Sequence, residues 1–465
     1  MTVESTDVLV IGAGAAGLFA ALAARGALAP AGQVLAPPAG APSVTVLQNE
    51  PRLGLKVLVS GGGRCNVTNQ AVSEVDYECD APHLLRGFLR GFPAASARAF
   101  FEGQGVRLYA EPGGKLFPVS DDARDVLGAL LGAVRAAGAA IVTPAEVTGL
   151  EPADGGWSAR TAQGATWLAR RVIVATGGKS LPKTGSRGWG LEALARLGHE
   201  LAPPLPALCG LRLASDGPLA GLAGLTVPAV LSLVPRAAGL DQLAGARFRP
   251  LHRAAGSLLV THQGASGPLA LDLSGSCGRA LLRGEDVVLR GDFWSLLALP
   301  DSPWAAFREL PKPPGASLPA EQAPRPPGRE AFQAWAERAL DRERGLANAL
   351  SPPLPRALAA ALVQAAGLDP SQPVKRLDAR QRGRLVEALG HADLRLLGTE
   401  GYAKAEVTSG GVLLAELDRV TLESKRCPGL HACGEVVNVT GRLGGFNFQW
   451  AWSSGFAAGA GAGRP

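Results

Sequence analysis

The segment SGGGRCNVTN, residues 60–69, places a cation, a thiol and an amide directly after three glycines. Glycine triplets cost conformational entropy and are used where the backbone must approach another group closely. Arg64 supplies positive charge, and Cys65 supplies a thiol that can donate a proton. The alternative is a tight structural turn with a buried, unreactive cysteine. The three glycines are Gly61, Gly62 and Gly63.

A second group of glycines lies near the N-terminus, in DVLVIGAGAAGLFAALAARG. Residues 8–11 predict a buried strand and residues 15–25 a helix, with a G-x-G-x-x-G turn between them. Such a turn allows close approach to a pyrophosphate, and the helix N-terminus faces the phosphates with its positive dipole end. We therefore predict a dinucleotide-binding domain. The residues expected to contact the cofactor here are Gly12, Gly14, Ala15, Ala16 and Gly17.

In such a domain, the second strand should end in an acid that holds the adenosine ribose. Residues 28–42 are rich in Pro, Gly and Ala and predict a surface loop, which is followed by a strand at 44–47. The residue after this strand is Gln48, and Glu50 lies two positions further along. Gln48 and Glu50 stay open as alternatives for the ribose contact.

Composition sets limits on the class of protein. The chain has 465 residues, of which 47% are hydrophobic and 18% charged, so we expect a globular protein of two or three domains. The net charge of +6 permits an anionic partner without requiring one. The six cysteines show no CxxC spacing, which fits reduced cytosolic thiols and predicts no metal site. Glycines interrupt the uncharged run 8–24, so we predict no membrane segment and a cytoplasmic location.

Longer segments resemble a known family in the same order along the chain. The chain is similar to the BaiN/YhiN-like family of FAD-dependent flavoproteins, and the resemblance thins between about residues 276 and 394. The segments that carry it are LGLKVLVSGGGRCNVTN (53–69), GGKLFPVSDDARDVLGALL (113–131), VIVATGGKSLPKTGSRGWG (172–190), THQGASGP (261–268) and KAEVTSGGV with TLESKRCPGLHACGEVVNVTGRLGGFNFQWAWSSG (within 404–455).

The resemblance implies an α/β fold. It predicts a discontinuous Rossmann-like FAD-binding domain of the glutathione-reductase type, an inserted β-barrel-like domain, and a helical subdomain within that insertion. Residues 330–390 show helical periodicity, and the Pro-rich residues 311–327 predict an exposed loop. The expected boundaries are 1–200 and 404–465 for the FAD-binding domain, 201–275 and 391–403 for the barrel, and 276–390 for the helical or irregular insertion.

The resemblance also implies cofactor contacts. In FAD domains of this type, the segment after the second strand runs along the cofactor towards the flavin ring. Lys56 and Arg64 then supply charge to the pyrophosphate or to a reduced flavin, and Asn66 supplies hydrogen bonds. The residues Ala175, Thr176 and Gly177 form a second strand-to-glycine turn.

Near the C-terminus, Gly434 and Glu435 stand where this class places contacts to the ribityl chain. The loop with Gly444, Gly445 and Asn447 opens a helix whose N-terminus would point at the flavin. Many relatives carry Asp at the positions of Asn438 and Trp189, which puts an acid–base role for the first loop in doubt.

By resemblance, we expect reduction of an activated C=C bond. One branch of the family acts on steroid enones of bile acids, and another reduces uridine in large-subunit ribosomal RNA to dihydrouridine. Hydride reaches one carbon and a proton the other, so Cys65 is a candidate proton donor. His262, in the loop THQGASGP, is a second candidate, and the alternative is a histidine that only holds backbone.

One G-x-G-x-x-G turn is found, so NAD(P)H is expected, by resemblance, as a transient reductant. A uridine of ribosomal RNA is the preferred acceptor. A small-molecule enone and a non-catalytic flavin-binding protein are the alternatives. The basic runs 236–253 and 374–384 are either RNA phosphate contacts or solvated faces.

Overall fold

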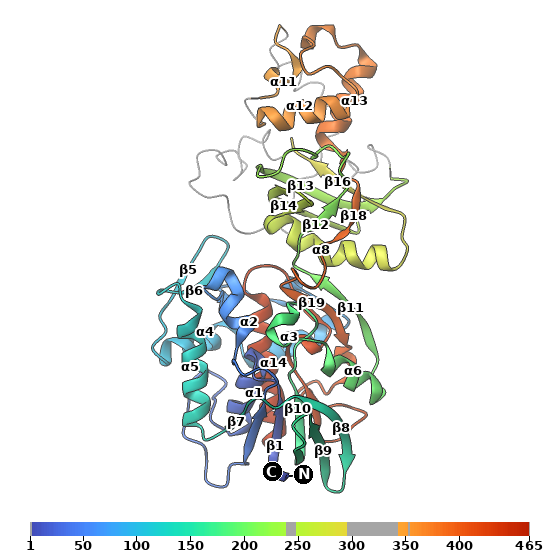
Figure 1. Ribbon diagram of the computed structural model, residues 1–465. Helices are drawn as coiled ribbons and strands as arrows, with labels where there is room; N and C mark the ends of the chain where they lie inside the picture. The colour runs from blue at the N-terminus through green and yellow to red at the C-terminus, as the bar shows by residue number, and fades with distance from the viewer. Residues whose placement is uncertain (1, 239–247, 295–342, 352–353, 465) are drawn as a thin grey trace. The chain divides into compact units, whose positions relative to one another are not determined.

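The computed structural model describes residues 2–238, 248–294, 343–351 and 354–464. The chain divides into two compact units (Figure 1). The first consists of residues 1–206 and 405–465, and the second of residues 207–404. The first unit is therefore discontinuous in the sequence, and the second is inserted into it. The predicted finer division of the insertion stays a prediction.

The first unit is built on a seven-stranded sheet of order β7-β2-β1-β10-β9-β8, in which β20 also pairs with β10. The strands β7, β2, β1, β10 and β20 pair in parallel. The predicted strand at 8–11 is the fully buried end of β1, as the near-continuous apolar run requires. These strands are β1 (Val3–Ile11), β2 (Val44–Leu47), β7 (Ala140–Val142), β8 (Val147–Ala153), β9 (Gly156–Thr161), β10 (Thr166–Val174) and β20 (Leu430–Ala432).

Two helices of the first unit, α1 (Ala15–Ala24) and α14 (Phe446–Ala462), touch backbone to backbone. A Cβ atom at Gly455 would lie 2.5 Å from the carbonyl oxygen of Ala16, and one at Gly459 would meet that of Ala20. The four-residue spacing places both glycines on one helix face. Gly455 faces Ala16 and Gly459 faces Ala20, so the two helices run parallel. Gly455 lies nine residues after the start of α14, whereas Ala16 lies one residue after the start of α1. The N-terminus of α14 therefore extends roughly 12 Å beyond that of α1.

The remaining elements of the first unit surround this helix pair and the sheet. The helices are α2 (Leu55–Val59), α3 (Pro82–Gly91), α4 (Ala94–Gly103), α5 (Ala123–Ala136) and α6 (Trp189–Arg196). The strands are β3 (Thr68–Asn69), β4 (Tyr77–Cys79), β5 (Leu108–Ala110), β6 (Lys115–Pro118), β11 (Leu201–Ala207), β19 (Val407–Val412) and β21 (Val439–Gly441). Phe19 of α1 packs its ring against Trp452 of α14 at 5.1 Å, which adds an aromatic contact to the glycine contact.

The second unit contains an antiparallel sheet of order β17-β16-β13-β14-β15-β12-β18. Only Leu394 and Arg395 join the two edge strands, β17 and β18. This short connection keeps the edge strands close together, so the sheet must be strongly curled. The strands are β12 (Leu211–Leu213), β13 (Thr226–Pro235), β14 (His252–Thr261), β15 (Gly264–Ser266), β16 (Val287–Asp292), β17 (Ala392–Asp393) and β18 (Leu396–Thr399).

Helices complete the core of the second unit. Leu269, Leu273 and Cys277 of α8 are fully buried in a cluster with Leu231 and Leu258 of the sheet. The helices are α8 (Gly267–Leu282), α11 (Leu346–Ala349), α12 (Arg356–Ala365) and α13 (Ala379–Gly390). The predicted Pro-rich loop at 311–327 and the predicted helical residues 330–342 lie outside the described residues.

None of the described helices combines the length and the apolar character that crossing a bilayer needs.

Candidate active site

The N-terminal glycine turn has the geometry that its sequence predicts. Gly12 has φ +110°, and its N–H donates to the carbonyl of Leu47 at 2.8 Å. A Cβ atom at Gly12 would lie 2.5 Å from the carbonyl oxygen of Ala175, and one at Gly17 would overlap the carbonyl oxygen of Gly12. Both positions therefore require glycine, one for the turn and one for helix–strand packing.

The N-terminus of α1 is open to a ligand. Gly14 occupies the N-cap, no side chain caps the helix, and no acid lies in its first turn. A Cβ atom built on Gly14 would meet no described atom within 4 Å. The N–H groups of Ala15 and Ala16 thus begin a helix whose positive end is free, which fits the pyrophosphate of a dinucleotide.

The two candidates for the ribose contact have different partners. Gln48 accepts a hydrogen bond from the N–H of Ala13 at 2.9 Å and donates to Asn49 at 2.9 Å. Glu50 forms an ion pair with Arg187 at 2.7 Å. Gln48 therefore ties the end of β2 to the glycine turn. The ribose contact itself stays a prediction for both residues.

The glycine triplet forms a left-handed turn. Its φ values are +56° at Gly61, +70° at Gly62 and +88° at Gly63. Three successive left-handed residues strain any side chain with a Cβ atom, so backbone conformation alone accounts for the triplet. A Cβ atom at Gly62 would meet no described atom within 4 Å, so the turn also presents an uncovered backbone surface.

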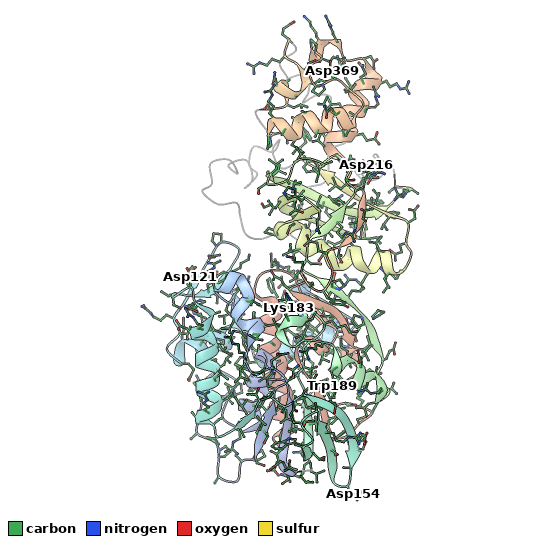
Figure 2. The ribbon with its side chains drawn as sticks, in the orientation of Figure 1. Asp121, Asp154, Lys183, Trp189, Asp216 and Asp369 are labelled. Atoms are coloured by element: carbon green, nitrogen blue, oxygen red, sulfur yellow. The ribbon has the colours of Figure 1, made fainter. Side chains whose placement is uncertain are left out.

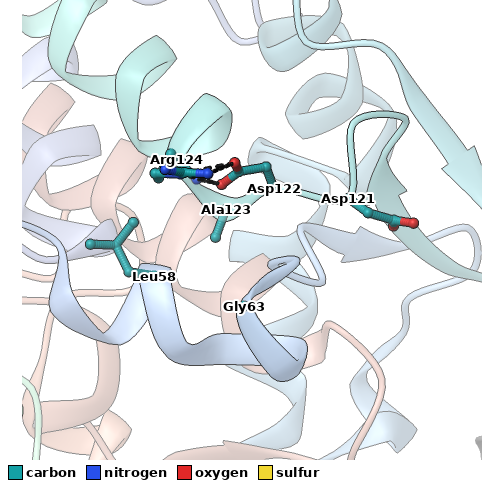
Figure 3. Close-up of a pocket in the computed structure, with 6 residues that line it drawn as sticks. All are labelled: Leu58, Gly63, Asp121, Asp122, Ala123 and Arg124. Carbon is teal, nitrogen blue, oxygen red and sulfur yellow. Dashed lines mark hydrogen bonds and ion pairs between the residues drawn. The ribbon is translucent and has the colours of Figure 1, made fainter.

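One side of this turn borders a shallow pocket of about 420 Å³ (Figure 3). Asp122 caps α5 by accepting from the N–H of Arg124, and its carboxylate also pairs with the Arg124 guanidinium. Two neighbouring carboxylates disfavour an anionic ligand in this pocket. It is lined by Leu58, Gly63, Asp121, Asp122, Ala123 and Arg124.

Arg64 turns towards the hairpin of β5 and β6. Its guanidinium lies 2.6 Å from Glu111 and 3.5 Å from Asp121, and it stacks over the Phe117 ring at 4.0 Å. The hydrogen bond to Glu111 is the main reason that the pKa of Arg64 is raised. Glu111 and Asp121 thus offset the charge of Arg64. The contact of Arg64 with the cofactor stays a prediction.

The two candidate proton donors lie in different units. Cys65 is fully buried in the core of the first unit, and burial raises the pKa of its thiol to about 12. His262 is exposed in the turn between β14 and β15 of the second unit. The thiol is therefore protonated at neutral pH. The predicted role of each residue in proton transfer stays a prediction.

Asn66 and Asn69 join the glycine-triplet segment to the start of α14. The Asn66 amide is oriented so that its nitrogen and its oxygen both have hydrogen-bond partners, and its oxygen accepts from the N–H of Gly445 at 2.9 Å. Asn69 donates to the carbonyl of Gly444 at 3.0 Å. Gly445 has φ +93°, and a Cβ atom there would lie 2.5 Å from the carbonyl oxygen of Thr68. Two segments that are far apart in the sequence thus share one hydrogen-bonded junction.

The predicted helix after this junction is α14, with Gly445 as its N-cap and no capping side chain. The Asn447 side chain accepts from the N–H of Gly441 and donates to the Gly441 carbonyl, at 2.9 Å and 2.8 Å. Asn447 therefore fixes the loop that precedes the helix. Its backbone N–H lies in the first turn, where a helix stabilises negative charge.

Lys56 and Glu435 pair with each other. The Lys56 ammonium lies 2.8 Å from Glu435 and 2.7 Å from the hydroxyl of Ser180. Glu435 also accepts from the Ser180 hydroxyl and from the N–H of Thr408. Burial alone would raise the pKa of Glu435. The Lys56 charge and these hydrogen bonds outweigh the effect of burial, and the pKa of Glu435 is lowered as a result. Glu435 is thus held as a carboxylate.

The turn after β10 lies against the end of β1 and against Glu435. The N–H of Ala175 donates to the carbonyl of Ile11 at 2.9 Å, and Gly177 has φ +71°. Thr176 donates to the Gly177 carbonyl at 3.3 Å. The adjoining Gly178 has no room for a side chain, because a Cβ atom would lie 2.7 Å from Glu435. The predicted turn and the predicted ribityl segment are therefore neighbours.

Sequence reasoning missed Ser180 and Thr408. Both are buried, and both hydrogen-bond to Glu435. Their spacing from Glu435 follows no local motif, so only the fold reveals them. Trp189 is the first residue of α6 (Figure 2). Asn438 donates to Asp80 at 2.9 Å, so it has a structural partner.

A family model described as the HI0933-like protein Rossmann domain matches residues 6–461. The chain belongs to this family. A relative named ribosomal RNA dihydrouridine synthase, from Escherichia coli strain K12, is 31% identical over 98% of this chain and 97% of its own length. A relative named 3-dehydro-bile acid delta(4,6)-reductase, from Clostridium scindens, is 30% identical over 98% of this chain and 99% of its own length.

Among solved structures, the 3-ketosteroid-delta4-(5alpha)-dehydrogenase of Rhodococcus jostii is 16% identical, with a TM-score of 0.47 and coverage of 99% of this chain and 97% of its own. The family predicted from the motifs is confirmed. The Rossmann-type α/β fold and the class of flavin-dependent oxidoreductase enzymes are confirmed with it.

Proposed function

We propose that this HI0933-like protein uses FAD and NAD(P)H to reduce the C5=C6 bond of a uridine in large-subunit ribosomal RNA. FAD, when bound and first reduced by hydride from NAD(P)H, would supply a hydride to one carbon of the bond. The other carbon takes a proton, and the two additions convert uridine to dihydrouridine. The observation that carries the cofactor part of the proposal is the junction of Asn66 and Asn69 with the start of α14, beside the open glycine turn at Gly62. The choice of RNA as the acceptor rests on the named relatives.

The residues of the first unit fit the cofactor in two places. At one, Gly12, Gly14 and the uncapped start of α1 receive the pyrophosphate. At the other, the uncapped start of α14 stabilises the negative charge that builds on a reduced ring system. The helices α1 and α14 run parallel, and the N-terminus of α14 extends about 12 Å beyond that of α1. The two positive helix ends can therefore contact different parts of one extended ligand.

Two kinds of observation support ribosomal RNA as the acceptor. The relatives from Escherichia coli and Haemophilus influenzae, 31% and 29% identical, are both named ribosomal RNA dihydrouridine synthase. The chain also carries a net charge of +6, which is compatible with a polyanionic partner.

A small-molecule enone is the second candidate acceptor. It is favoured by the Clostridium scindens bile-acid reductase, whose identity of 30% is nearly the same. The chemistry at the C=C bond is shared, so the cofactor-binding residues do not separate the two candidates.

The proposal is tested with the purified, FAD-loaded protein. It is incubated with NADH or NADPH and with large-subunit ribosomal RNA that lacks dihydrouridine, and nucleosides are measured by mass spectrometry. We expect dihydrouridine to form with one of the two reductants. Turnover of a steroid enone without any dihydrouridine would instead establish the second candidate.

The proton donor is tested in the same assay with Cys65→Ala and His262→Gln. Loss of a general acid lowers turnover by roughly 10²–10⁴-fold. The rate of flavin reduction by NAD(P)H should stay unchanged in the variant that removes the donor. A variant with full turnover excludes that residue from the role.

A further inference from the structure

The second unit carries a row of arginines on α13 and the turn before it. Arg376, Arg380 and Arg384 are all exposed. Arg380 and Arg384 are four residues apart, so they lie on one face of α13, and the opposite face buries Leu385 and Leu389 in the core. This group of three is called the α13 arginines below.

The α13 arginines have no carboxylate partner among the described residues, a property that they share with some other exposed arginines such as Arg52 and Arg107. Several exposed arginines elsewhere do pair with acids, as Arg98 does with Glu102 and Arg160 with Glu151. Within the described residues, the α13 arginines form no ion pair.

The acids nearest to the α13 arginines in sequence are mostly occupied elsewhere. Asp378 caps α13 by accepting from the N–H of Gln381 at 2.7 Å. Asp369, in the α12–α13 connection (Figure 2), accepts from the N–H and hydroxyl of Ser371 at 2.8 Å. Glu387 is the one exposed acid on α13, and it forms no ion pair within the described part. The three α13 arginines outnumber the two acids of this segment, Asp378 and Glu387, so a net positive charge remains.

Arg384 is also held at a defined place. Its guanidinium lies 3.1 Å from where a Cβ atom at Gly367 would stand, over the turn that ends α12. Guanidinium groups present a planar fork of donors that matches phosphate oxygens, and uncompensated ones release counterions when they bind a polyanion. The face thus has the composition and spacing of a phosphate-binding surface.

We propose that the α13 arginines are the surface by which the protein binds the phosphate backbone of its RNA substrate. This inference rests on the proposed function, because it presumes that the acceptor is RNA. It assigns the docking role to the inserted unit and leaves the cofactor to the first unit. Because these contacts are to phosphates, they contribute affinity and positioning but not base specificity.

The test compares two triple variants of the FAD-loaded full chain. The first is Arg376→Gln, Arg380→Gln and Arg384→Gln. The matched control is Arg98→Gln, Arg160→Gln and Arg170→Gln, which removes the same net charge from arginines that pair with Glu102, Glu151 and Asp7. Circular dichroism and FAD content verify that each variant is folded.

Binding to a transcript of large-subunit ribosomal RNA is measured between 50 and 200 mM salt. For the α13 variant, we expect the slope of log affinity against log salt to fall by about 2 to 3, and affinity near 150 mM salt to fall at least ~10-fold. The control should change the slope by less than about 1.

Three results would overturn the inference. If the control loses as much affinity as the α13 variant, overall charge and not this face governs binding. If the wild type binds and reduces the RNA and the α13 variant binds equally well, only the surface is wrong. If the wild type neither binds the RNA nor forms dihydrouridine, the proposed function fails and the surface fails with it.

Discussion

The Lys56 ammonium and the Glu435 carboxylate lie 2.8 Å apart, although 379 positions separate them in the chain. Lys56 belongs to α2, which leads into the glycine triplet, and Glu435 follows β20. The pair therefore ties together the two segments that we assign to the cofactor. Its side chains are 25% and 19% exposed, so water screens the attraction only partly.

Lys56→Met should destabilise the first unit. It leaves the Glu435 carboxylate mostly buried without its cation, which costs about 2 kcal/mol at this degree of exposure. Lys56→Arg retains the charge and serves as the matched control. Thermal unfolding and FAD affinity are measured for both variants. Equal stability of Lys56→Met and the wild type would show that the ion pair does not hold the two segments together.

Gly459→Ala should be strongly destabilising, because its Cβ atom would overlap the backbone of α1 at Ala20. We expect a loss of at least ~2 kcal/mol in the free energy of unfolding. Gly132→Ala in α5 is the control, since a Cβ atom there would meet no described atom within 4 Å. That change should stabilise by about 1 kcal/mol. A neutral effect at Gly459 would contradict the close contact of α1 and α14.

His391 should make the second unit less stable in acid. Burial, together with the guanidiniums of Arg290 and Arg253, lowers the pKa of His391 to about 4 from an ordinary 6.5. The folded state therefore favours the neutral ring. Its stabilising contribution is complete above pH 6.5 and is lost as the pH falls from 6.5 towards 4, by on the order of 3 kcal/mol.

The prediction for His391 is checked by thermal unfolding between pH 7 and pH 4.5. His391→Gln cannot take up the proton, so its stability should depend less on pH than that of the wild type. An identical pH dependence in His391→Gln and the wild type would rule out the buried neutral ring.

Cys65 should resist alkylation in the folded protein. Its side chain is fully buried, and its thiol pKa is about 12, so almost no thiolate is available at pH 8. Iodoacetamide followed by peptide mass spectrometry should leave Cys65 unmodified in buffer and modify it in denaturant. Cys427 is partly exposed and serves as an internal comparison. Rapid modification of native Cys65 would show that the segment opens in solution.

Local motifs predicted the parts of the site that depend on backbone conformation. The φ values at Gly12 and at Gly61 to Gly63 follow from the glycine patterns, because only glycine adopts them without strain. The partners of charged side chains could not be predicted in this way. Arg64 pairs with Glu111, which the β5–β6 hairpin brings near, and no local motif predicts that pair.

Packing contacts were equally hard to predict. Gly455 and Gly459 are spaced for a helix contact, but a chain with 61 glycines makes that spacing uninformative by itself. Ser180 and Thr408 show no pattern at all. Their role depends on where β10 and β19 bring the chain, and that is a property of the whole fold.

The central claim is that the protein forms dihydrouridine in large-subunit ribosomal RNA. The most direct measurement is nucleoside mass spectrometry of that RNA from cells of the source organism with and without the gene. We predict that dihydrouridine is present in the first and absent from the second, and that it returns when the intact gene is restored. Dihydrouridine that is missing from both, or equal in both, would contradict the claim.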